Sequence, residues 1–388
     1  MLVVFYGNPD YHITVTRELE KFRDYFTLHL LTSDVREPAY AWTSDVTIER
    51  VGLKIKYGDR SFAEKIWTAI DYLLFMLIVR RRIGSLKPAI VYTLDSWAYT
   101  AVSMVGSRGA PLVFKTLDQD PPEASSRFGL KRWVDKYALR QGPRASLVVL
   151  LDKDRANYYL RRSGDKRFPL IVPSYASINL VTMPNDFEAL IDRRFDRREI
   201  LYTGVVKSTI AIEESVQALG LLGSGYQLTI YGLVGPDETA RLESLAKSVS
   251  ANLSMRGWVR GPDLIANTME AAVGLVLFKP ISDNYQNMAT ATTKLYEYAA
   301  RGIPVVVPDT RSFRDHLQHE EWVAYAGMDN PQSIANGIES FLKNPERYRQ
   351  ASRAARRAFE DRYNYEAVFP PLLERLTDLC DQTRGSAS

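Results

Sequence analysis

The chain has 388 residues, more than one hydrophobic core usually supports, so its length predicts two domains. Apolar residues make up 46% and charged residues 25% of the sequence, which is ordinary for a soluble globular protein. The single cysteine, Cys380, excludes an internal disulfide and a cysteine-cluster zinc site. The four histidines show no metal-ligand spacing.

The charge is unevenly distributed along the chain. Residues 1–180 hold 27 Lys and Arg against 19 Asp and Glu, a net charge of +8, and the remainder holds 23 against 27, a net charge of −4. This asymmetry indicates an anionic partner for the first half. The most apolar run, 72–79, is far shorter than the ~20 residues of a membrane-spanning helix. The N-terminus reads as a buried strand without a basic leader, so we expect no targeting segment.

The first half of the chain alternates between strand and helix patterns. We expect strands at 2–6, 26–32, 89–92, 112–115, 147–151 and 169–173, and helices at 14–25, 62–83, 97–105 and 127–140. Gly84 is the expected end of the long second helix. This rhythm predicts a parallel, doubly wound sheet.

After a polar and irregular linker at 178–198, the alternation restarts. We expect strands at 199–203, 226–231, 253–256, 273–278 and 303–307, helices at 211–222, 239–250, 264–270 and 294–301, and closing helices at 333–342, 347–359 and 365–381. The first three of these strands end at glycines. The sequence therefore predicts a second Rossmann-like domain over 199–364, after a first domain over 1–177.

The stretch 284–309 is the strongest candidate for a binding site. It reads as a loop, a helix that Thr292 or Thr293 caps, a stop at Gly302 and a buried strand. A helix N-terminus just before such a strand binds anions through its backbone N–H groups. Glu297, one turn into the helix, is placed to accept hydrogen bonds from a ribose diol. The alternative is that Glu297 and Lys294 are ordinary solvated helix charges.

The run KLYEYAARGIPVV, residues 294–306, resembles the donor-binding signature of the retaining glycosyltransferases of family four, of the bacterial polysaccharide and glycolipid type. The resemblance implies the GT-B fold: two Rossmann-like, doubly wound parallel-sheet domains facing a cleft. It also implies that the last helix and tail, 365–388, cross back to pack on the N-terminal domain.

The run 201–219 is similar to the family's strand, glycine turn and helix that receive the donor diphosphate. Gly204 matches the glycine turn, but Val205 stands where arginine is frequent, and Ile210-Ala211 stands where Lys-Gly is frequent. Lys207 is a substitute cation, because a flexible ammonium serves phosphate as a point charge. Alternatively, Lys207 only decorates a loop.

Two further loops match the family's donor contacts. In GWVRGPDL, residues 257–264, Trp258 and Val259 fall at the positions that contact the base, although a Trp there also fits ordinary packing. Ala289 stands where the family has the first of two glutamates, and Glu297 matches the second. Asn284 and Tyr285 are the alternative sugar contacts, so the sequence constrains the sugar weakly.

In the first domain, the resemblance places Asp118 beside the acceptor hydroxyl. Asp118 and Asp120 also form an Asp-x-Asp pair, which binds Mg²⁺ or Mn²⁺ in the other glycosyltransferase fold. We expect no metal, because helix dipoles and a lysine stabilise the leaving diphosphate in the two-Rossmann layout. His12, with Asp10, is a second candidate for handling the acceptor hydroxyl, although a lone loop histidine is more often incidental.

These observations predict a glycosyltransferase that uses a UDP- or GDP-sugar as donor, needs no cofactor, retains configuration and acts on a glycan or lipid-linked acceptor. The expected catalytic residues are Asp118, His12 and Lys207. A nucleotide-sugar epimerase and a non-catalytic nucleotide-sugar-binding protein remain alternatives. We expect no nucleic-acid partner, because the excess charge is modest and no reader module is present.

The helix expected at 62–83 combines apolar residues with Lys65 and Arg80 to Arg82, and 127–144 is basic and aromatic. Such faces can rest on anionic lipid headgroups. We therefore expect a cytoplasmic protein, peripheral on the inner face of the cytoplasmic membrane. The alternative is that the first helix simply packs on the sheet.

Overall fold

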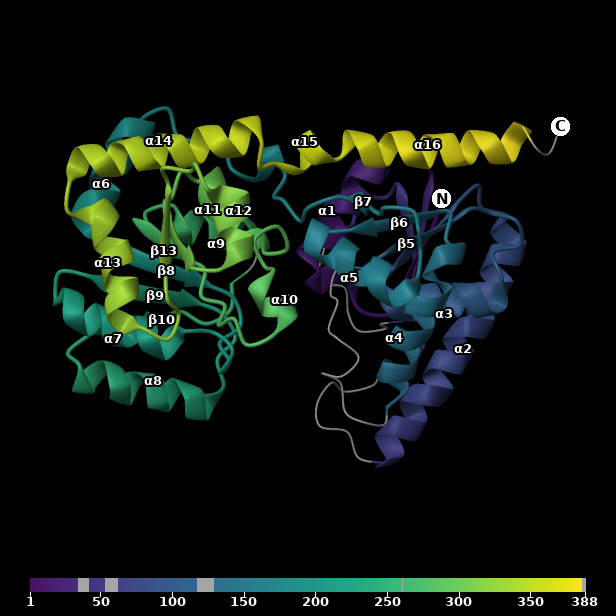
Figure 1. The fold of residues 1–388 in the computed structure, drawn as a ribbon, viewed down its shortest axis with the longest axis horizontal. Helices are drawn as coiled ribbons and strands as arrows, with labels where there is room; N and C mark the ends of the chain where they lie inside the picture. The colour runs from purple at the N-terminus through teal and green to yellow at the C-terminus, as the bar shows by residue number, and fades with distance from the viewer. Residues whose placement is uncertain (34–41, 53–61, 117–128, 260, 386–388) are drawn as a thin grey trace. The chain divides into compact units, whose positions relative to one another are not determined.

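The computed structural model describes residues 1–33, 42–52, 62–116, 129–259 and 261–385. The chain forms two α/β units, one made of Met1–Pro173 with Val368–Ser388 and the other of Ser174–Ala367 (Figure 1). Each unit has its own sheet, of seven and six strands, and the paired strands of both sheets are parallel. The prediction of two doubly wound parallel sheets is therefore confirmed.

The first sheet has the strand order β3-β2-β1-β4-β5-β6-β7. Its strands are β1 (Leu2–Phe5), β2 (Leu28–Thr32), β3 (Val46–Arg50), β4 (Val91–Leu94), β5 (Leu112–Lys115), β6 (Leu147–Leu150) and β7 (Leu170–Ile171). The order reverses between β1 and β4, so the carboxyl ends of these two strands form the switch point at which open α/β sheets bind ligands.

Helices cover both faces of the first sheet. They are α1 (Ile13–Phe22), α2 (Phe62–Leu86), α3 (Asp95–Val105), α4 (Leu130–Gln141), α5 (Lys153–Ser163) and α16 (Pro370–Gly385). Residues Phe75 and Val79 of α2, Val102 of α3 and Val134 of α4 share one buried core with Val4 of β1. Gly84 does not end α2: the helix runs on to Leu86, and Lys87 takes the left-handed conformation with φ 44°.

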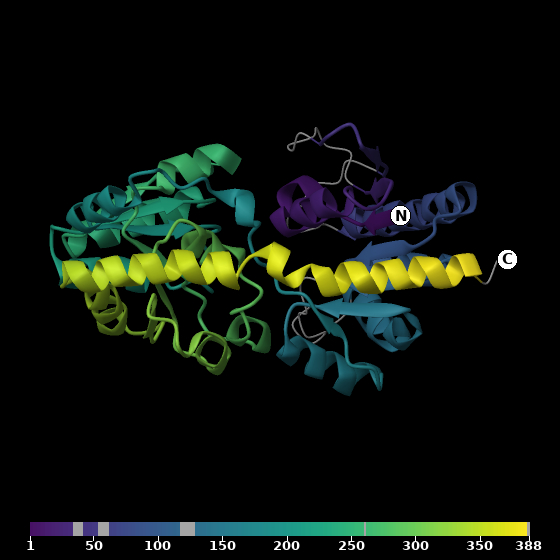
Figure 2. The same cartoon turned by 90° about the horizontal axis from the view of Figure 1, so that it is seen from above.

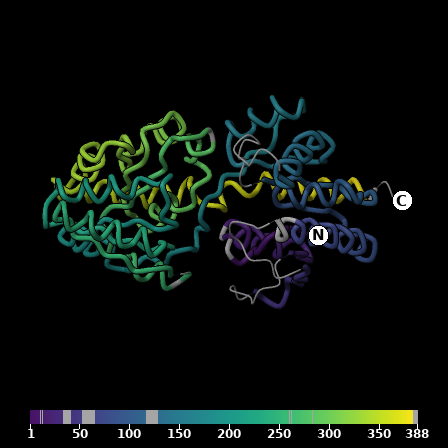
Figure 3. Tube along the Cα trace, turned by 90° about the horizontal axis from the view of Figure 1, so that it is seen from below, coloured from purple at the N-terminus to yellow at the C-terminus, as the bar shows by residue number. Residues whose placement is uncertain are grey.

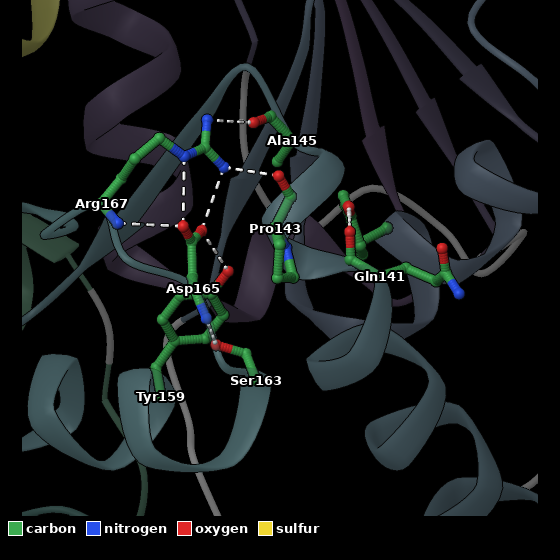
Figure 4. A network of polar contacts seen from close by, with 8 residues as sticks. Gln141, Pro143, Ala145, Tyr159, Ser163, Asp165 and Arg167 are labelled. Atoms are coloured by element: carbon green, nitrogen blue, oxygen red, sulfur yellow. Dashed lines mark hydrogen bonds and ion pairs between the residues drawn. The ribbon is translucent and has the colours of Figure 1, made fainter.

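The sequence reading missed α5, which Asp152 caps by accepting from the Arg155 N–H. The turn after α5 is held by Arg167, which donates to the carbonyls of Ala145 at 2.9 Å and Pro143 at 2.7 Å and to the Asp165 carboxylate (Figure 4). Tyr159 of α5 donates to the same carboxylate at 3.1 Å. This network ties the end of α5 to the segment that follows α4.

The second sheet has the order β10-β9-β8-β11-β12-β13. Its strands are β8 (Glu199–Thr203), β9 (Gln227–Tyr231), β10 (Asn252–Met255), β11 (Val273–Leu275), β12 (Val305–Pro308) and β13 (Val323–Ala326). Its helices are α6 (Phe187–Arg197), α7 (Ile212–Leu222), α8 (Pro236–Ser248), α9 (Gly261–Thr268), α10 (Asp283–Gln286), α11 (Thr293–Ala300), α12 (Arg311–Leu317), α13 (Pro331–Leu342) and α14 (Pro345–Asp361). In Figure 1, α7 and α8 lie below this sheet and α11 and α14 lie above it.

The segment predicted as an irregular linker, 178–198, contains helix α6. Leu190, Ile191 and Arg194 are its buried side chains. Arg194 donates to the carbonyls of Met269 at 2.6 Å and Arg301 at 2.9 Å. The prediction was wrong because the sequence does not distinguish a buried arginine from a solvated one. With Arg194 counted as exposed, this highly charged helix shows no clear buried face.

The helix predicted at 365–381 is broken into α15 (Tyr365–Val368) and α16, and two prolines start the second piece. Phe369, just before the prolines, packs against Phe22 and Tyr25 of the first unit, with ring centroids 5.8 and 6.1 Å away. Figure 2 shows α16 lying along the elements of that unit. Within the described residues, no helix is long and apolar enough to cross a membrane.

The two points at which the chain passes between the units are joined to each other. Ala176 and Asn364 form a parallel bridge, and the Tyr365 N–H donates to the Ala176 carbonyl at 2.8 Å. Glu366 accepts from the Ser177 hydroxyl at 2.8 Å and the Ile178 N–H at 2.7 Å. The teal and yellow traces of these segments can be followed in Figure 3.

Candidate functional site

Three glycine turns line the carboxyl edge of the second sheet, after β8, β9 and β10. Gly204 has φ +129° and Gly257 has φ +70°, backbone conformations that favour glycine. A Cβ at Gly232 would lie 1.7 Å from the Gly204 carbonyl oxygen. The Gly204 N–H donates to the Tyr231 carbonyl at 2.9 Å, and the Gly232 N–H donates to the Gly257 carbonyl at 2.8 Å. The turns therefore form one continuous backbone surface that only glycine at position 232 permits.

Helix α11 is fastened to the end of β8 by Tyr298. The Thr203 N–H donates to the Tyr298 hydroxyl at 3.0 Å, and the Thr203 hydroxyl lies 3.1 Å from the same atom. Gly274 makes room for the ring, because a Cβ there would lie 2.4 Å from it. Burial raises the pKa of Tyr298 to about 12, so its hydroxyl stays neutral. These contacts set the position of the first turn of α11.

Lys294, in that first turn, reaches over the Gly204 turn. Its ammonium lies 4.3 Å from the ring centre of Tyr202 and 5.3 Å from that of Phe278. Burial lowers the pKa of Lys294 to about 7; the Glu297 carboxylate opposes this shift and the Lys207 ammonium adds to it. Among the described residues Lys294 forms no ion pair. An anion bound beside it would raise its pKa and be held strongly in return.

The other predicted residues of α11 are nearby. Thr292, one of the two predicted capping residues, is the N-cap residue of α11, but its side chain makes no capping hydrogen bond. Thr293 is the first helical residue, and the first turn contains no acidic side chain. Glu297 is half-buried, one turn after Lys294. The first backbone N–H groups of α11 are therefore accompanied by a lysine and by no side-chain cap from Thr292.

Lys207, in the loop after β8, lies near Tyr285 of helix α10. The Lys207 ammonium lies 5.4 Å from the ring centre of Tyr285. The Thr209 hydroxyl donates to the Tyr285 hydroxyl at 3.3 Å. Tyr285 and Asn284 both lie in the short helix α10, which Ser282 caps. Two of the predicted donor contacts, Lys207 and Tyr285, are thus neighbours.

The start of α7 differs from that of α11. Its first turn carries Glu213 and Glu214, and no side chain caps it. Glu214 pairs with Lys279 at 2.6 Å, and Glu213 pairs with Arg241 at 2.5 Å. These carboxylates stand where the helix dipole would attract an anion. The helix start near Gly204 therefore carries negative side chains that the start of α11 lacks.

Trp258 and Val259 directly follow the Gly257 turn. Trp258 is 46% exposed, whereas Val259 is half-buried. Val205 and Leu233, which follow the other two glycines, are also exposed. The Val206 N–H donates to the Leu233 carbonyl at 3.0 Å, so two of these loops run side by side. The edge of the turns is consequently apolar and solvent-facing.

Of the predicted site residues of the first unit, the structure describes His12, which follows the turn after β1. His12 is exposed, and its ring meets that of Phe5 edge-on at 5.2 Å. Asp118 and Asp120 lie outside the described residues. In the part of the chain that the structure describes, no group of three or more His, Cys, Asp or Glu side chains could hold a metal ion.

Asp95 is a residue that the sequence reading missed. It follows β4 at the switch point, has φ +68°, and receives a hydrogen bond from the Thr116 hydroxyl at 3.4 Å. A left-handed conformation is uncommon for any residue except glycine, and such residues concentrate at functional sites. The sequence feature that could have indicated Asp95 is its position as a carboxylate directly after the apolar strand β4.

The comparisons with known proteins agree with this architecture. Residues 211–374 match a family described as "Glycosyl transferase-like". Sucrose-phosphate synthase from Thermosynechococcus elongatus superposes with a TM-score of 0.75 at 16% identity, over 100% of this chain and 99% of that one. The fold is that of the GT-B glycosyltransferases.

Two other structures with this fold are similar. The Anabaena protein HepE, solved with UDP-glucose, has a TM-score of 0.70 at 14% identity, over 97% of this chain and 100% of that one. The trehalose-phosphate synthase of Burkholderia multivorans has a TM-score of 0.67 at 12% identity, over 100% and 98% of the two chains. No curated protein matches the sequence.

Proposed function

We propose that this protein is a glycosyltransferase that takes a sugar from a UDP- or GDP-sugar. The observation that carries the proposal is Lys294, an ammonium held between aromatic rings above a surface of glycine backbone. The diphosphate of a nucleotide is typically held by a cation together with the backbone N–H groups of a helix N-terminus. The family match over 211–374 covers most of this unit, including Lys294, and supports the same function.

In this proposal the chain's own residues stabilise the departing diphosphate. Lys294 and the first N–H groups of α11 receive its charge, and Lys207 contributes from beside Tyr285. Glu297 accepts hydrogen bonds from the ribose, Trp258 and Val259 contact the base, and Asn284 and Tyr285 contact the sugar. Asp118 and His12 serve the acceptor hydroxyl. The resemblance of residues 294–306 to family four supports transfer with retention and without a metal.

The test begins with donor binding. Thermal shifts are measured with UDP-, GDP-, ADP- and dTDP-sugars for the native chain, Lys294→Ala and Lys343→Ala, a control lysine whose side chain is 68% exposed. We expect one donor class to stabilise the native chain and the control, but not Lys294→Ala. Equal shifts in all three proteins would contradict the proposal.

Turnover then separates the alternatives. Release of nucleoside diphosphate only when a glycan or lipid-linked acceptor is present identifies a transferase. Conversion of the donor with no acceptor identifies an epimerase, and binding without release under any acceptor identifies a binding protein.

We also propose that the acceptor lies at an anionic membrane surface on the cytoplasmic side. Helix α2 packs one face into the core through Phe75 and Val79 and exposes large apolar residues on the other. Trp67 is 54%, Leu73 60% and Leu77 63% exposed. An apolar patch of this kind marks an interaction surface.

Basic residues accompany that face. Arg80 and Arg81 follow on α2 and are exposed, and α4 adds an exposed Trp133 between Lys131 and Lys136. Apolar and aromatic side chains beside cations fit the headgroup region of an anionic bilayer. A second copy of the same basic face would be repelled by it.

A further inference from the structure

The carboxyl ends of β1, β2 and β3 lie at one level in the first sheet. Phe5 pairs with Thr32, and Thr32 pairs with Arg50. After β1 the chain makes a tight turn in which the Asn8 side-chain oxygen accepts from the Asp10 N–H at 3.0 Å. Residues 8–10 are thereby brought to the Arg50 side chain.

Asp10 ties this corner together. The Arg50 Nη2 donates to both oxygens of the Asp10 carboxylate, at 2.8 and 2.9 Å. The Trp42 ring N–H donates to the same carboxylate at 2.8 Å. The Asp10 side chain is completely buried, so the charges of Asp10 and Arg50 compensate each other.

Within the part of the chain that the structure describes, two buried donors of this corner have no hydrogen-bond partner, Asn8 Nδ2 and Arg50 Nη1. Asn8 is only 4% exposed. Native proteins almost always pair such groups, because an unpaired buried donor has lost its water without gaining a partner. Asn8 Oδ1 and Arg50 Nη2 are already engaged with Asp10, so the unpaired nitrogens are held in fixed positions.

We propose that Asn8 and Arg50 form a subsite for the hydroxyl oxygens of a sugar, and that Asp10 is the positioning residue that holds both. The subsite lies at the carboxyl edge of a parallel sheet, where this fold class places its ligands. Both nitrogens can only donate, so their partner must accept. Because Asp10 already neutralises Arg50, the corner favours neutral oxygens over an anion. The inference rests on the proposed function in one respect: the sugar bound in this subsite is the acceptor of the proposed transfer reaction.

The experiment measures sugar binding by saturation-transfer NMR. The probes are glucose, galactose, mannose and N-acetylglucosamine, each with the full native chain. The variants are Asn8→Ser and Arg50→Lys, which remove the two unpaired nitrogens. Serine keeps a side-chain oxygen that can accept from the Asp10 N–H, and lysine keeps a positive charge beside the Asp10 carboxylate. Asn344→Ser is the matched control, because Asn344 also caps a helix with its side-chain oxygen but lies in the other unit. Arg82→Lys is the control for Arg50, because Arg82 pairs with Glu49 of the same strand β3.

At least one sugar is expected to bind the native chain and both controls. In Asn8→Ser and Arg50→Lys its Kd should rise by about tenfold. Equal binding in the four variants, no binding to the native chain, or a crystal soaked with the sugar that shows only water on both nitrogens would each overturn the proposal. If Asn8→Ser does not fold, Asn8→Asp keeps the capping oxygen and still removes Nδ2.

UDP-sugar thermal shifts on the same samples separate the two proposals. If sugar binding depends on Asn8 but no nucleotide sugar shifts the melting temperature, the proposed function is contradicted and the subsite is supported. If Asn8→Ser changes neither the thermal shift with the nucleotide sugar nor the binding of the free sugar, only the subsite is contradicted.

Discussion

The ammonium of Lys294 lies 4.3 Å from the centre of the Tyr202 ring, although the two residues are far apart in the sequence. The ring belongs to β8 and the lysine to α11, and Tyr298 holds these two elements together. A cation kept in this way is stabilised by the ring face yet partly removed from water. At the carboxyl edge of the second sheet there is therefore a cation with which a bound anion can form an ion pair.

Lys294→Met should weaken donor binding about tenfold to a hundredfold, which corresponds to about 1.5–3 kcal/mol for a hydrogen bond to a charged group. Methionine keeps the apolar stem against Tyr202 and removes only the charge. Isothermal titration calorimetry with the donor found in the thermal-shift panel measures the change. The proposal fails if the affinity stays within twofold of the native value, or if Lys343→Met loses as much.

Donor binding should weaken as the pH rises above about 7. Burial lowers the pKa of Lys294 to about 7 in the unbound protein, so above that pH the amine is largely neutral. A diphosphate ester stays ionised and raises the lysine pKa, so binding takes up a proton in this window. Calorimetry in buffers of different ionisation enthalpy would detect about one proton at pH 8. Lys294→Met should abolish this uptake, and an uptake that persists in the variant would assign it to another group.

Gly232→Ala should destabilise the protein by about 3 kcal/mol or more, because its Cβ would lie 1.7 Å from the Gly204 carbonyl oxygen and must displace backbone. Gly235→Ala is the control, because a Cβ there meets nothing within 4 Å. Urea unfolding of both variants measures the difference. A Gly232→Ala protein as stable as the control would show that the turns separate easily.

Arg194→Met should cost about 3 kcal/mol, because the carbonyls of Met269 and Arg301 lose their buried donor. The neighbouring Arg193→Met should change stability by less than about 0.5 kcal/mol, since its side chain is 51% exposed and pairs only at the surface. Chemical denaturation of the two variants provides the comparison. Similar losses in both would mean that helical propensity, not the buried guanidinium, is responsible.

Leu73→Gln with Leu77→Gln should reduce co-sedimentation with phosphatidylglycerol vesicles while leaving the unfolding midpoint nearly unchanged, because both side chains are exposed and glutamine adds no charge. Leu221→Gln is the control, an exposed leucine of the second unit. Pure phosphatidylcholine vesicles test the contribution of the arginines. A native chain that stays in the supernatant with both vesicle types would remove the membrane from the proposal.

The features that were predictable from the sequence are those that depend on neighbouring residues, such as where strands end. Gly204, Gly232 and Gly257 were recognised as strand ends because each follows a short apolar run, and the structure places them in adjacent turns. The pairing of Lys294 with Tyr202 and Phe278 was not predictable, because it joins three separate elements.

Buried polar contacts were the other failure of sequence reasoning. Asp10 and Arg50 are 40 residues apart, and nothing in either neighbourhood indicates that they meet. Arg194 reads as a solvated charge on a polar segment, so α6 was missed. Such residues are recognisable only after the backbone has brought their partners together.

The first unit is assembled from both ends of the chain, since Val368–Ser388 belongs with Met1–Pro173. A ribosome therefore finishes the second unit before it releases the helix that the first unit needs. Expressing residues 174–367 alone keeps every strand of one sheet, whereas no single uninterrupted fragment reproduces the other unit. Shortening the C-terminus would thus damage the half of the protein that is made first.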